Sequence, residues 1–317
     1  MTAELDFTGR VAIVTGAGQG IGRAYAELLA SRGASVVVND LGVATGGGGF
    51  DDSRSRAAAA EIVAAGGIAV PDASDISTEA GAQALVDRAI DTFGRLDIVI
   101  NNAGIFALDR FPDIDVDLLQ RMFDVHIKGA FNVTRAAWAP MAAAGYGRVV
   151  FTTSTSALGA ADTVAYGMAK MGVLGLARAI AQAGIEHGIR ANLVAPQAMT
   201  RMMSTGMGRG DDFTPVPEKS PALVAPLVAV LAHEDCPVNG EAFVSGMRRV
   251  SRLFVAETAG YVHPGLDLTP ETVLEHWDEI TDVATAEVVD RTMASSAISG
   301  RRFAQVPHAA AVSATVS

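Results

Sequence analysis

The chain has 317 residues, of which 50% are apolar and 19% charged, and its net charge is −11. This composition excludes an intrinsically disordered protein, because so much apolar surface can offset the entropy that folding costs. The acidic balance disfavours nucleic acid as a partner, and a single cysteine, Cys236, excludes a disulfide-stapled secreted scaffold. One α/β domain of roughly 250 residues would account for most of the length.

No segment has the composition of a membrane anchor or a secretion signal. The longest wholly apolar run, 222–232, contains Pro226, and it is shorter than the about 20 residues that a bilayer span needs. Residues 1–10 lack a basic stretch followed by an apolar one, and the final residues match no sorting signal. We therefore expect a cytoplasmic protein without stable membrane insertion.

Short apolar runs alternate with helix-like segments through the first 250 residues. We expect strands at 11–15, 36–38, 68–70, 97–100, 148–152, 190–194 and 242–244, and helices at 21–32, 53–65, 79–93, 118–144 (two pieces broken near Pro140), 164–182 and 221–233. Apolar strands that alternate with helices are typical of a mostly parallel sheet covered on both faces. The pattern predicts a three-layer α/β Rossmann fold, doubly wound around about seven strands.

The alternation stops near residue 250. The residues Thr269 to Glu271 supply an N-cap, a proline at the first helical position and an acidic side chain, so they predict a short helix over 271–280. The Ala-, Val- and Ser-rich end predicts a loose tail. We expect one nucleotide-binding domain over 1–250 and a C-terminal extension over 251–317.

A glycine-rich segment separates the first predicted strand from the first predicted helix. Within Thr15 to Gly22, the glycines at 16, 20 and 22 would let the backbone turn tightly and approach a pyrophosphate. The helix N-terminus then offers N–H groups and a partial positive charge. A glycine turn without a ligand is the alternative, but the position between strand and helix favours a dinucleotide site.

Asp40 ends the second predicted strand, where a carboxylate accepts hydrogen bonds from the adenosine ribose hydroxyls. It would repel a 2′-phosphate, and Leu41 rather than an arginine follows it, so NAD is predicted instead of NADP. A capping or turn role is the alternative. Asp75 and the segment Asn101 to Gly104 follow the next two strands, at the sheet edge where ligands bind. The glycine run 46–49 fits a disordered linker and a loop beside the sheet equally well.

Tyr166 and Lys170 lie four residues apart on a predicted helix and therefore share a face. A free tyrosine has a pKa of about 10 and is a poor base at neutral pH. A nearby ammonium from Lys170, together with the nicotinamide charge, would lower the pKa of Tyr166. Tyr166 would then take a proton from an alcohol, and Ser154 would hold the developing carbonyl oxygen. The alternative for the pair alone is a solvated helix face.

Together these motifs resemble the short-chain dehydrogenase/reductase family over residues 8–250. The resemblance rests on Thr15 to Gly22, Asp75, Asn101 to Gly104, Ser154, Tyr166 to Lys170 and Asn192 to Pro196. It implies catalysis by Ser154, Tyr166 and Lys170. It also implies an NAD site, with no metal, formed by Gly16, Gln19, Gly20, Ile21, Asp40, Asp75, Ile76, Asn102, Ala103, Gly104, Tyr166, Lys170 and Pro196.

Two positions depart from the family pattern. The family usually has a catalytic asparagine in a Val-Asn-x-x-Gly segment, whereas this chain has His126 there. His126 either replaces the asparagine in part as a proton relay or is only a structural element of its helix. Pro196 is followed by Gln197 instead of the usual glycine, which leaves the shape of that loop open.

Further segments look like the branch represented by the (3R)-hydroxyacyl-CoA dehydrogenase unit of multifunctional enzyme type 2, also called 17β-hydroxysteroid dehydrogenase type 4. They are Val36 to Gly42, Val125 to His126, Thr134 to Trp138, Val224 to Val228, His233 to Cys236, Thr269 to Val273 and Trp277. We expect a stand-alone bacterial form that works as a homodimer or homotetramer.

The resemblance to this branch implies NAD-dependent oxidation of a secondary alcohol on a bulky lipid. The candidate substrates are a (3R)-hydroxyacyl-CoA, a sterol side-chain hydroxyacyl-CoA and a 17β-hydroxysteroid. Two alternatives stay open. One is an enzyme of the same fold for a polyol, a sugar or an acyl-carrier-protein thioester, and the other is a non-catalytic nucleotide-binding scaffold.

The segment 197–220 is rich in methionines and cations. Methionines suit a pocket that adapts to an apolar ligand, and cations suit CoA phosphates; core filling and isolated surface charge are the alternatives. These residues are Met199, Met202, Met203, Met207, Arg201, Arg209 and Lys219. The spacing of His187, His233 and Cys236 supports no metal site.

Overall fold

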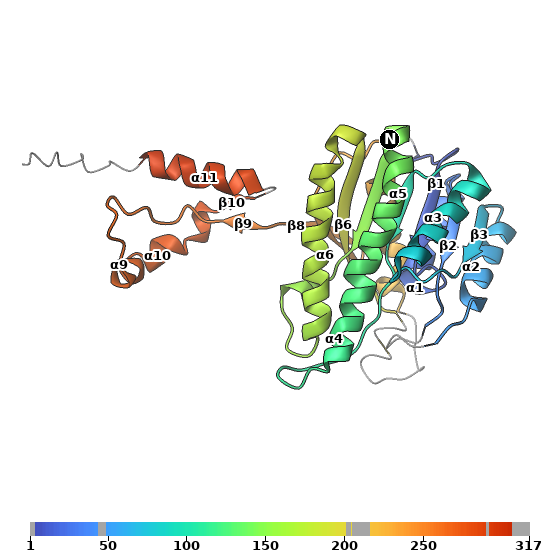
Figure 1. Ribbon diagram of the computed structural model, residues 1–317, viewed down its shortest axis with the longest axis horizontal. Helices are drawn as coiled ribbons and strands as arrows, with labels where there is room; N and C mark the ends of the chain where they lie inside the picture. The colour runs from blue at the N-terminus through green and yellow to red at the C-terminus, as the bar shows by residue number, and fades with distance from the viewer. Residues whose placement is uncertain (1–3, 44–48, 201–203, 205–215, 290–291, 306–317) are drawn as a thin grey trace, which may run out of the picture. The chain divides into compact units, whose positions relative to one another are not determined.

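The computed structural model describes residues 4–43, 49–200, 204, 216–289 and 292–305. The chain divides into two compact units, residues 1–252 and 253–317. Figure 1 draws the helices and strands of both units and labels most of them. Met202, Met203, Met207, Arg201, Arg209 and most of the glycine run 46–49 lie outside the described residues.

An eight-stranded sheet runs through the first unit in the order β3-β2-β1-β4-β5-β6-β7-β8. The strands are β1 (Val11–Thr15), β2 (Ser35–Asn39), β3 (Ile68–Asp72), β4 (Ile98–Asn101), β5 (Gly147–Thr152), β6 (Ile189–Gln197), β7 (Ala242–Gly246) and β8 (Arg249–Leu253). Strands β1 to β7 pair in parallel, which confirms the predicted doubly wound fold. The strand order reverses between β1 and β4, and open α/β sheets bind their ligands at such a switch point.

The eighth strand was not predicted from the sequence. β8 follows β7 after only Met247 and Arg248, whose φ angles are 50° and 61°. Two consecutive residues with positive φ make a tight turn that reverses the chain, so β8 runs back along β7 as a hairpin. β8 is mostly exposed; its sequence therefore lacks the apolar run by which the other strands were recognised.

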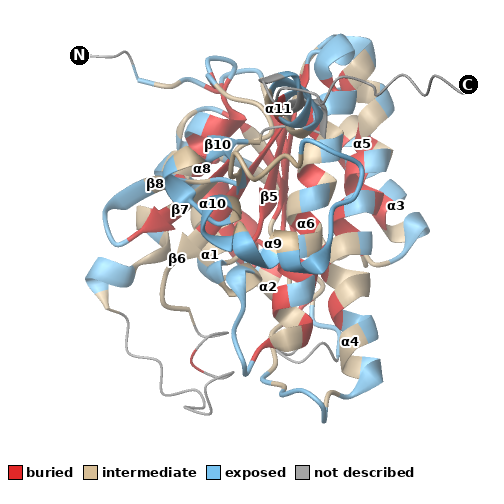
Figure 2. Cartoon of the chain, turned by 90° about the vertical axis from the view of Figure 1, so that its left-hand side faces the viewer, coloured by how far each residue is buried: buried red, intermediate tan, exposed pale blue. Residues whose placement is uncertain are grey.

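Helices cover both faces of the sheet. They are α1 (Gly20–Ser31), α2 (Ser53–Ala64), α3 (Glu79–Phe93), α4 (Val116–Phe123), α5 (Ala130–Ala144), α6 (Val164–Ala183) and α8 (Ala225–Ala232), with short 3₁₀ turns at Thr155–Leu158, Ile185–His187, Pro217–Lys219 and Pro221–Leu223. In Figure 2, α3, α5 and α6 lie on one side of the buried strands, and α1 and α8 lie on the other.

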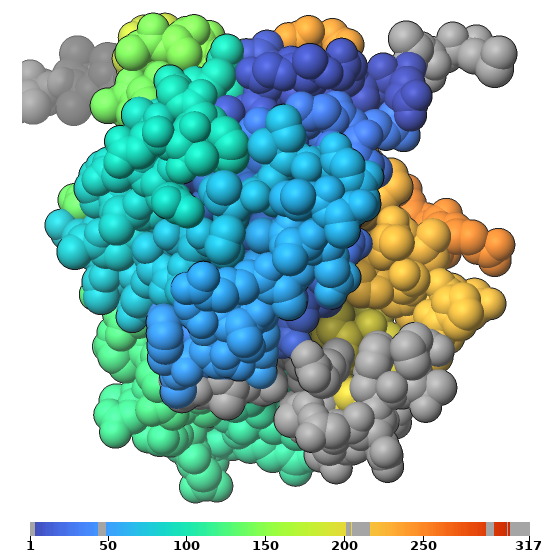
Figure 3. Space-filling model, turned by 90° about the vertical axis from the view of Figure 1, so that its right-hand side faces the viewer, coloured from blue at the N-terminus to red at the C-terminus, as the bar shows by residue number. Residues whose placement is uncertain are grey.

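Burial follows the strand order. Strands β1, β4 and β5 are buried along their whole length, as strands between two helical layers must be, whereas the edge strand β3 is only partly buried. Figure 3 looks at the molecule from the side of β3 and α2, where the surface is formed largely by the first third of the chain. The switch point between β1 and β4 therefore lies in the well-buried middle of the sheet.

The segment between β4 and β5 corrects one prediction. The helix is not broken at Pro140, which lies inside α5. A proline has no backbone N–H and so removes one hydrogen bond of the helix. α5 nevertheless continues for four residues beyond Pro140. The interruption is instead a π-helix, Asp124–Gly129, between α4 and α5. This wider turn carries His126 and buries its side chain, and π-helical turns are frequent at functional sites.

Helix α6 is, among the described helices, the one long and apolar enough to cross a membrane by length and composition. It packs along β6 and β5 as part of the helical layer of the first unit. It also carries the buried side chain of Lys170. These contacts are those of the core helix of an α/β domain.

The second unit contains more regular structure than predicted. Its described residues form a two-stranded antiparallel ribbon, three α-helices and a short 3₁₀ turn: β9 (Ala256–Glu257), α9 (Pro270–Glu275), α10 (Trp277–Ile280), the turn Val283–Thr285, β10 (Glu287–Val288) and α11 (Thr292–Gln305). The predicted N-cap is confirmed, because the Thr269 side chain accepts a hydrogen bond from the Thr272 N–H. The predicted single helix is divided into α9 and α10, and α11 occupies part of the expected loose tail.

Candidate active site

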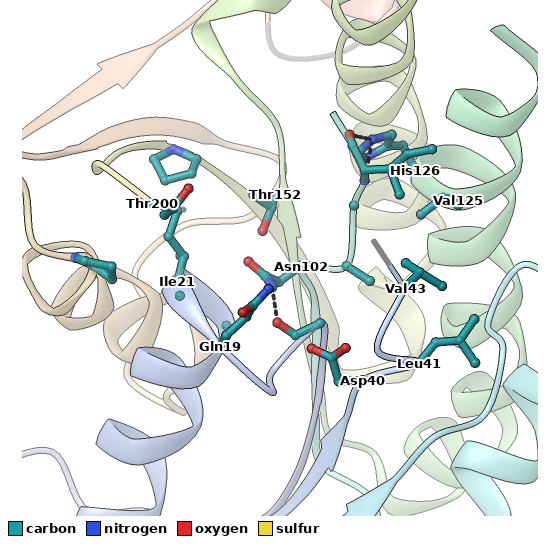
Figure 4. A pocket seen from close by; sticks show the side chains of 18 of the residues that line it. Gln19, Ile21, Asp40, Leu41, Val43, Asn102, Val125, His126, Thr152 and Thr200 are labelled. Atoms are coloured by element: carbon teal, nitrogen blue, oxygen red, sulfur yellow. Dashed lines mark hydrogen bonds between the residues drawn. The ribbon is translucent and has the colours of Figure 1, made fainter. Parts of the chain in front are cut away.

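A cavity of about 930 Å³ opens at the carboxyl ends of the central strands. It brings together nearly all of the predicted site residues. Those that line it are Gly16, Gln19, Gly20, Ile21, Asp40, Asp75, Ile76, Asn102, Ala103, Gly104, His126, Tyr166, Lys170 and Pro196. Figure 4 shows side chains from several of these loops around one common space. Ser154 is not part of the lining but lies beside Tyr166.

The glycine-rich turn after β1 is pressed against the loop after β4. Gly16 has a φ of 63°, and a Cβ atom on it would lie 2.8 Å from the Cα of Ala103. A Cβ on Gly22 would lie 2.3 Å from the carbonyl oxygen of Gly16. The Asn102 amide donates to the carbonyl oxygens of Thr15 and Gly16 at 2.9 and 3.1 Å. A side chain at either glycine would collide with these atoms, so the tight turn, which in a dinucleotide site lets the backbone approach a pyrophosphate, requires glycine at both positions.

The start of α1 suits an anion. Its N-cap residue, Gln19, makes no capping hydrogen bond with its side chain, and the first turn contains no acidic residue. The N-terminal N–H groups of a helix and its dipole favour negative charge. The glycine-rich turn from Gly16 to Gly22, here called the glycine cradle, and this helix end therefore fit the pyrophosphate of a dinucleotide.

Asp40 is held in place at the wall of the cavity by two backbone donors. Its Oδ2 accepts from the Gly18 N–H at 2.9 Å, and its Oδ1 accepts from the Gly42 N–H at 2.8 Å. An ionised carboxylate has about four acceptor positions, so each oxygen can still accept a bond from a ribose hydroxyl. The turn role and the ribose role that the sequence left as alternatives are compatible here.

Tyr166 and Lys170 line the cavity close to one another, and Ser154 lies beside Tyr166. The Lys170 ammonium nitrogen donates to the carbonyl oxygen of Thr152 at 2.7 Å and lies 5.5 Å from the centre of the Tyr166 ring. Burial lowers the pKa of Lys170 to about 7. Ser154 follows the end of β5, and its hydroxyl accepts from the Ser156 N–H at 3.1 Å.

The pKa of Tyr166 differs from the sequence-based expectation. Burial raises the pKa of Tyr166 to about 12, and a hydrogen bond with the Ser154 side chain opposes this shift. The expected lowering by Lys170 is not found in the protein alone, because burial also disfavours the charged form of that lysine. Burial therefore favours the neutral forms of both the phenol and the amine, and a further positive charge beside the phenol would favour the phenolate.

His126 is buried in the π-helix and touches Tyr166. Its ring meets the phenol ring edge-on, with the centroids 5.4 Å apart. Its Nε2 lies 2.9 Å from the carbonyl oxygen of Ile105 and 3.3 Å from the Ile105 amide nitrogen, so Nε2 donates to the first or accepts from the second according to the tautomer of the ring. Burial, and then Lys170, lower the pKa of His126 well below its ordinary value. The imidazole is therefore neutral at physiological pH.

A chamber of about 10 Å³ adjoins the main cavity between His126 and Lys170. Three buried polar atoms on its lining residues have no hydrogen-bond partner among the described residues: Asn101 Oδ1, Thr152 Oγ1 and His126 Nδ1. A chamber of this size has room for about one water molecule, which typically makes about three hydrogen bonds. Buried polar atoms without partners are rare, so this group marks a polar site.

Several residues that line the cavity were not predicted from the sequence. Arg54 on α2, Arg121 on α4 and Thr200 after β6 belong to its walls. An isolated arginine or threonine gives no local signal, and only the fold brings them to the cavity. Met199 and Lys219, which were predicted, also line it. Among the described residues, no three His, Cys, Asp or Glu side chains gather to hold a metal ion.

The sequence matches the profile of the family described as short chain dehydrogenase over residues 10–210. The chain belongs to the short-chain dehydrogenase family. It is therefore an oxidoreductase, and members of this family generally use NAD or NADP. This confirms the family resemblance seen in the sequence.

Relatives of this dehydrogenase include larger and smaller proteins. It is 42% identical over 292 residues to peroxisomal multifunctional enzyme type 2 of Mus musculus, covering 90% of this chain but only 38% of that enzyme. It is 37% identical over 255 residues to hydroxyacyl-CoA dehydrogenase ChsB1 of Mycobacterium tuberculosis, covering 77% of this chain and 79% of the relative. A crystal structure of a short chain dehydrogenase from Mycobacterium avium matches it with a TM-score of 0.76 at 32% identity, covering 89% of this chain and 97% of the other.

Proposed function

We propose that this dehydrogenase uses NAD to oxidise the secondary alcohol of a bulky hydroxyacyl-CoA thioester. The observation that carries the proposal is that one cavity joins the glycine cradle and Asp40 at one end to Tyr166 and Lys170 at the other. The name of the relative hydroxyacyl-CoA dehydrogenase ChsB1 supports the substrate class. Sterol side-chain thioesters are the finer candidate within this class, and a 17β-hydroxysteroid is the alternative bulky lipid alcohol.

The cofactor would be held by the glycine cradle, by the carboxylates of Asp40 and Asp75, and by Lys170. When bound, oxidised NAD accepts the hydride and adds a positive charge that favours the phenolate of Tyr166. Tyr166 takes the proton of the substrate hydroxyl as the C–H bond breaks. The Ser154 hydroxyl donates a hydrogen bond to the oxygen that becomes the carbonyl. Ser154 and Tyr166 are both partly buried, which limits the access of water to the reacting oxygen.

For His126 we propose a part in moving this proton onward. The small chamber is lined by His126 and Lys170 together with Asn101 and Thr152, and His126 Nδ1, Asn101 Oδ1 and Thr152 Oγ1 have no hydrogen-bond partner among the described residues. One water there would accept from Lys170 and donate to Nδ1, and so satisfy these atoms together. In this way a histidine takes the place of the asparagine that is usual in the family.

Comparing rates across alcohol classes tests the proposed function. The increase in NADH absorbance is followed with straight-chain and sterol-derived (3R)-hydroxyacyl-CoA thioesters, 17β-hydroxysteroids and polyols. We expect kcat/KM for a CoA thioester to exceed that for the other alcohols by at least about tenfold, because the remote CoA part contributes binding energy. A preference for polyols would contradict the proposed substrate class. NADH binding without turnover of any alcohol would indicate a scaffold.

Replacing Asp40 with alanine is expected to weaken the preference for NAD over NADP. The loss of charged hydrogen bonds to the ribose should lower kcat/KM with NAD by about 10- to 100-fold. Loss of the carboxylate should also remove its repulsion of a 2′-phosphate, so kcat/KM with NADP falls less or rises. The measurement is the ratio of the two values in wild type and variant. Asp91→Ala, at an exposed position of α3, is the matched control, and a wild type that prefers NADP would refute the assignment of Asp40.

A further inference from the structure

The helix that carries the catalytic side chains is capped from a distant segment. α6 begins at Val164, and its own N-cap residue, Thr163, makes no capping hydrogen bond. Thr163 Oγ1 is buried and has no partner among the described residues. Instead the carboxylate of Asp109, 55 residues earlier in the chain, accepts from the Val164 N–H at 2.5 Å, and it accepts from the Ala165 N–H at 3.0 Å.

The backbone around Asp109 strengthens this connection. The Asp109 N–H donates to the carbonyl oxygen of Asp162 at 3.0 Å, and Asp109 forms an isolated parallel bridge with Thr163. The first N–H groups of a helix have no partner within it. In α6 two of them bind the Asp109 carboxylate, and its negative charge also complements the positive end of the helix dipole.

The same segment touches the catalytic phenol. Tyr166 directly follows Ala165, whose N–H is bound by Asp109. The Phe106 ring meets the Tyr166 ring edge-on, with the ring centroids 5.2 Å apart. This contact is separate from the edge-on contact that His126 makes with Tyr166 from the π-helix. The residues from Phe106 to Asp109 therefore contact both the backbone that carries Tyr166 and its side chain. They also follow Asn102 to Gly104, which line the cavity.

We propose that Asp109 is a positioning residue for the reaction, which fixes the first turn of α6 and thereby holds the Tyr166 oxygen in place relative to Ser154 and Lys170. The inference rests on the proposed function, since it takes Tyr166 as the base. If the cap served stability alone, the side chain of the N-cap residue Thr163 could supply it. A cap supplied by Asp109 additionally ties the catalytic helix to the loop that borders the cofactor site.

Three variants of the full-length protein test this role: Asp109→Ala, Asp109→Asn and the control Asp113→Ala, an exposed position in the same loop. For Asp109→Ala we expect kcat to fall by about 10- to 100-fold, as when reacting groups are displaced by about 1 Å. The Kd for NADH should not change, because the glycine cradle and Asp40 are untouched. The primary deuterium isotope effect on kcat should rise, because hydride transfer becomes slower than product release. Asp109→Asn retains an acceptor oxygen and should recover much of the rate.

A purely structural cap would give a different result. Asp109→Ala would then lower the melting temperature or the folded fraction, and kcat per folded enzyme and the isotope effect would match wild type, which would overturn the proposal. Hydrogen exchange provides a readout that needs no substrate: the amides of Val164 and Ala165 should exchange faster in Asp109→Ala, and unchanged exchange would refute the capping role. If wild type oxidises no alcohol, the proposed function fails, whereas the exchange result still decides the cap.

Discussion

Replacing Tyr166 with phenylalanine is expected to lower kcat for alcohol oxidation by about 10²- to 10⁴-fold, the range that general base catalysis contributes. The substitution removes the phenol oxygen, which is the proton acceptor, and retains the ring that packs against Phe106 and His126. The fold and the glycine cradle are unaffected. NADH should therefore bind to the variant with an unchanged Kd, measured by fluorescence titration alongside steady-state turnover.

Tyr146→Phe is the matched control for this substitution. The Tyr146 ring lies between the guanidinium groups of Arg10 and Arg148, at 3.9 and 4.3 Å from its centre, and it does not line the cavity. Its variant should turn over at nearly the wild-type rate. If Tyr166→Phe keeps more than about a tenth of the wild-type kcat, its activation barrier has risen by less than about 1.4 kcal/mol. Tyr166 is then not the base.

Local patterns in the sequence were sufficient for the layout of the sheet and for most of the cavity. Strands buried between two helical layers must be apolar throughout, so β1, β4 and β5 were visible as short runs. The glycines at 16 and 22 were recognisable because the tight approach of two loops permits no side chain there. The four-residue spacing of Tyr166 and Lys170 placed both on one helical face.

Features that depend on contacts between distant segments were not predicted. The strand β8 is exposed and polar, and only the turn at Met247 and Arg248 brings it to the sheet. The π-helical turn around His126 depends on how the helix packs and has no local sequence pattern. Pro140, which in the sequence indicated a helix break, lies inside α5. The cap from Asp109 joins residues 55 positions apart, beyond the reach of any capping pattern in the sequence of α6.

The electrostatics of the catalytic pair also depended on the fold. Spacing indicated that Lys170 would lie near Tyr166, and in the structure the Lys170 Nζ lies 5.5 Å from the centre of the Tyr166 ring. Spacing does not indicate depth, and burial shifts both pKa values toward the neutral forms, to about 12 for Tyr166 and about 7 for Lys170. A lysine in this state cannot lower the pKa of its neighbour as an ammonium at the surface of a helix would.

Replacing Lys170 with methionine is therefore expected to change how the stability of the protein alone depends on pH. The pKa of Lys170 is about 7 in the folded protein against an ordinary value of 10.5, so between these values the unfolded chain binds one more proton. The free energy of unfolding of wild type should rise with pH across this window, by up to about 1.4 kcal/mol per pH unit. In Lys170→Met this contribution is absent, and at pH 7 the variant avoids a penalty of roughly 4 kcal/mol, less the lost bond to Thr152.

Urea unfolding of the protein without NAD, between pH 7 and 10, measures this slope, with Lys219→Met at the exposed rim of the cavity as the control. Above pH 10 the raised pKa of Tyr166 acts in the opposite direction, because the unfolded phenol loses its proton first. Equal slopes for wild type and Lys170→Met would mean that Lys170 stays charged in the folded protein at neutral pH. Tyr166 would then have a cation beside it before any cofactor binds, and its pKa would lie lower than burial alone dictates.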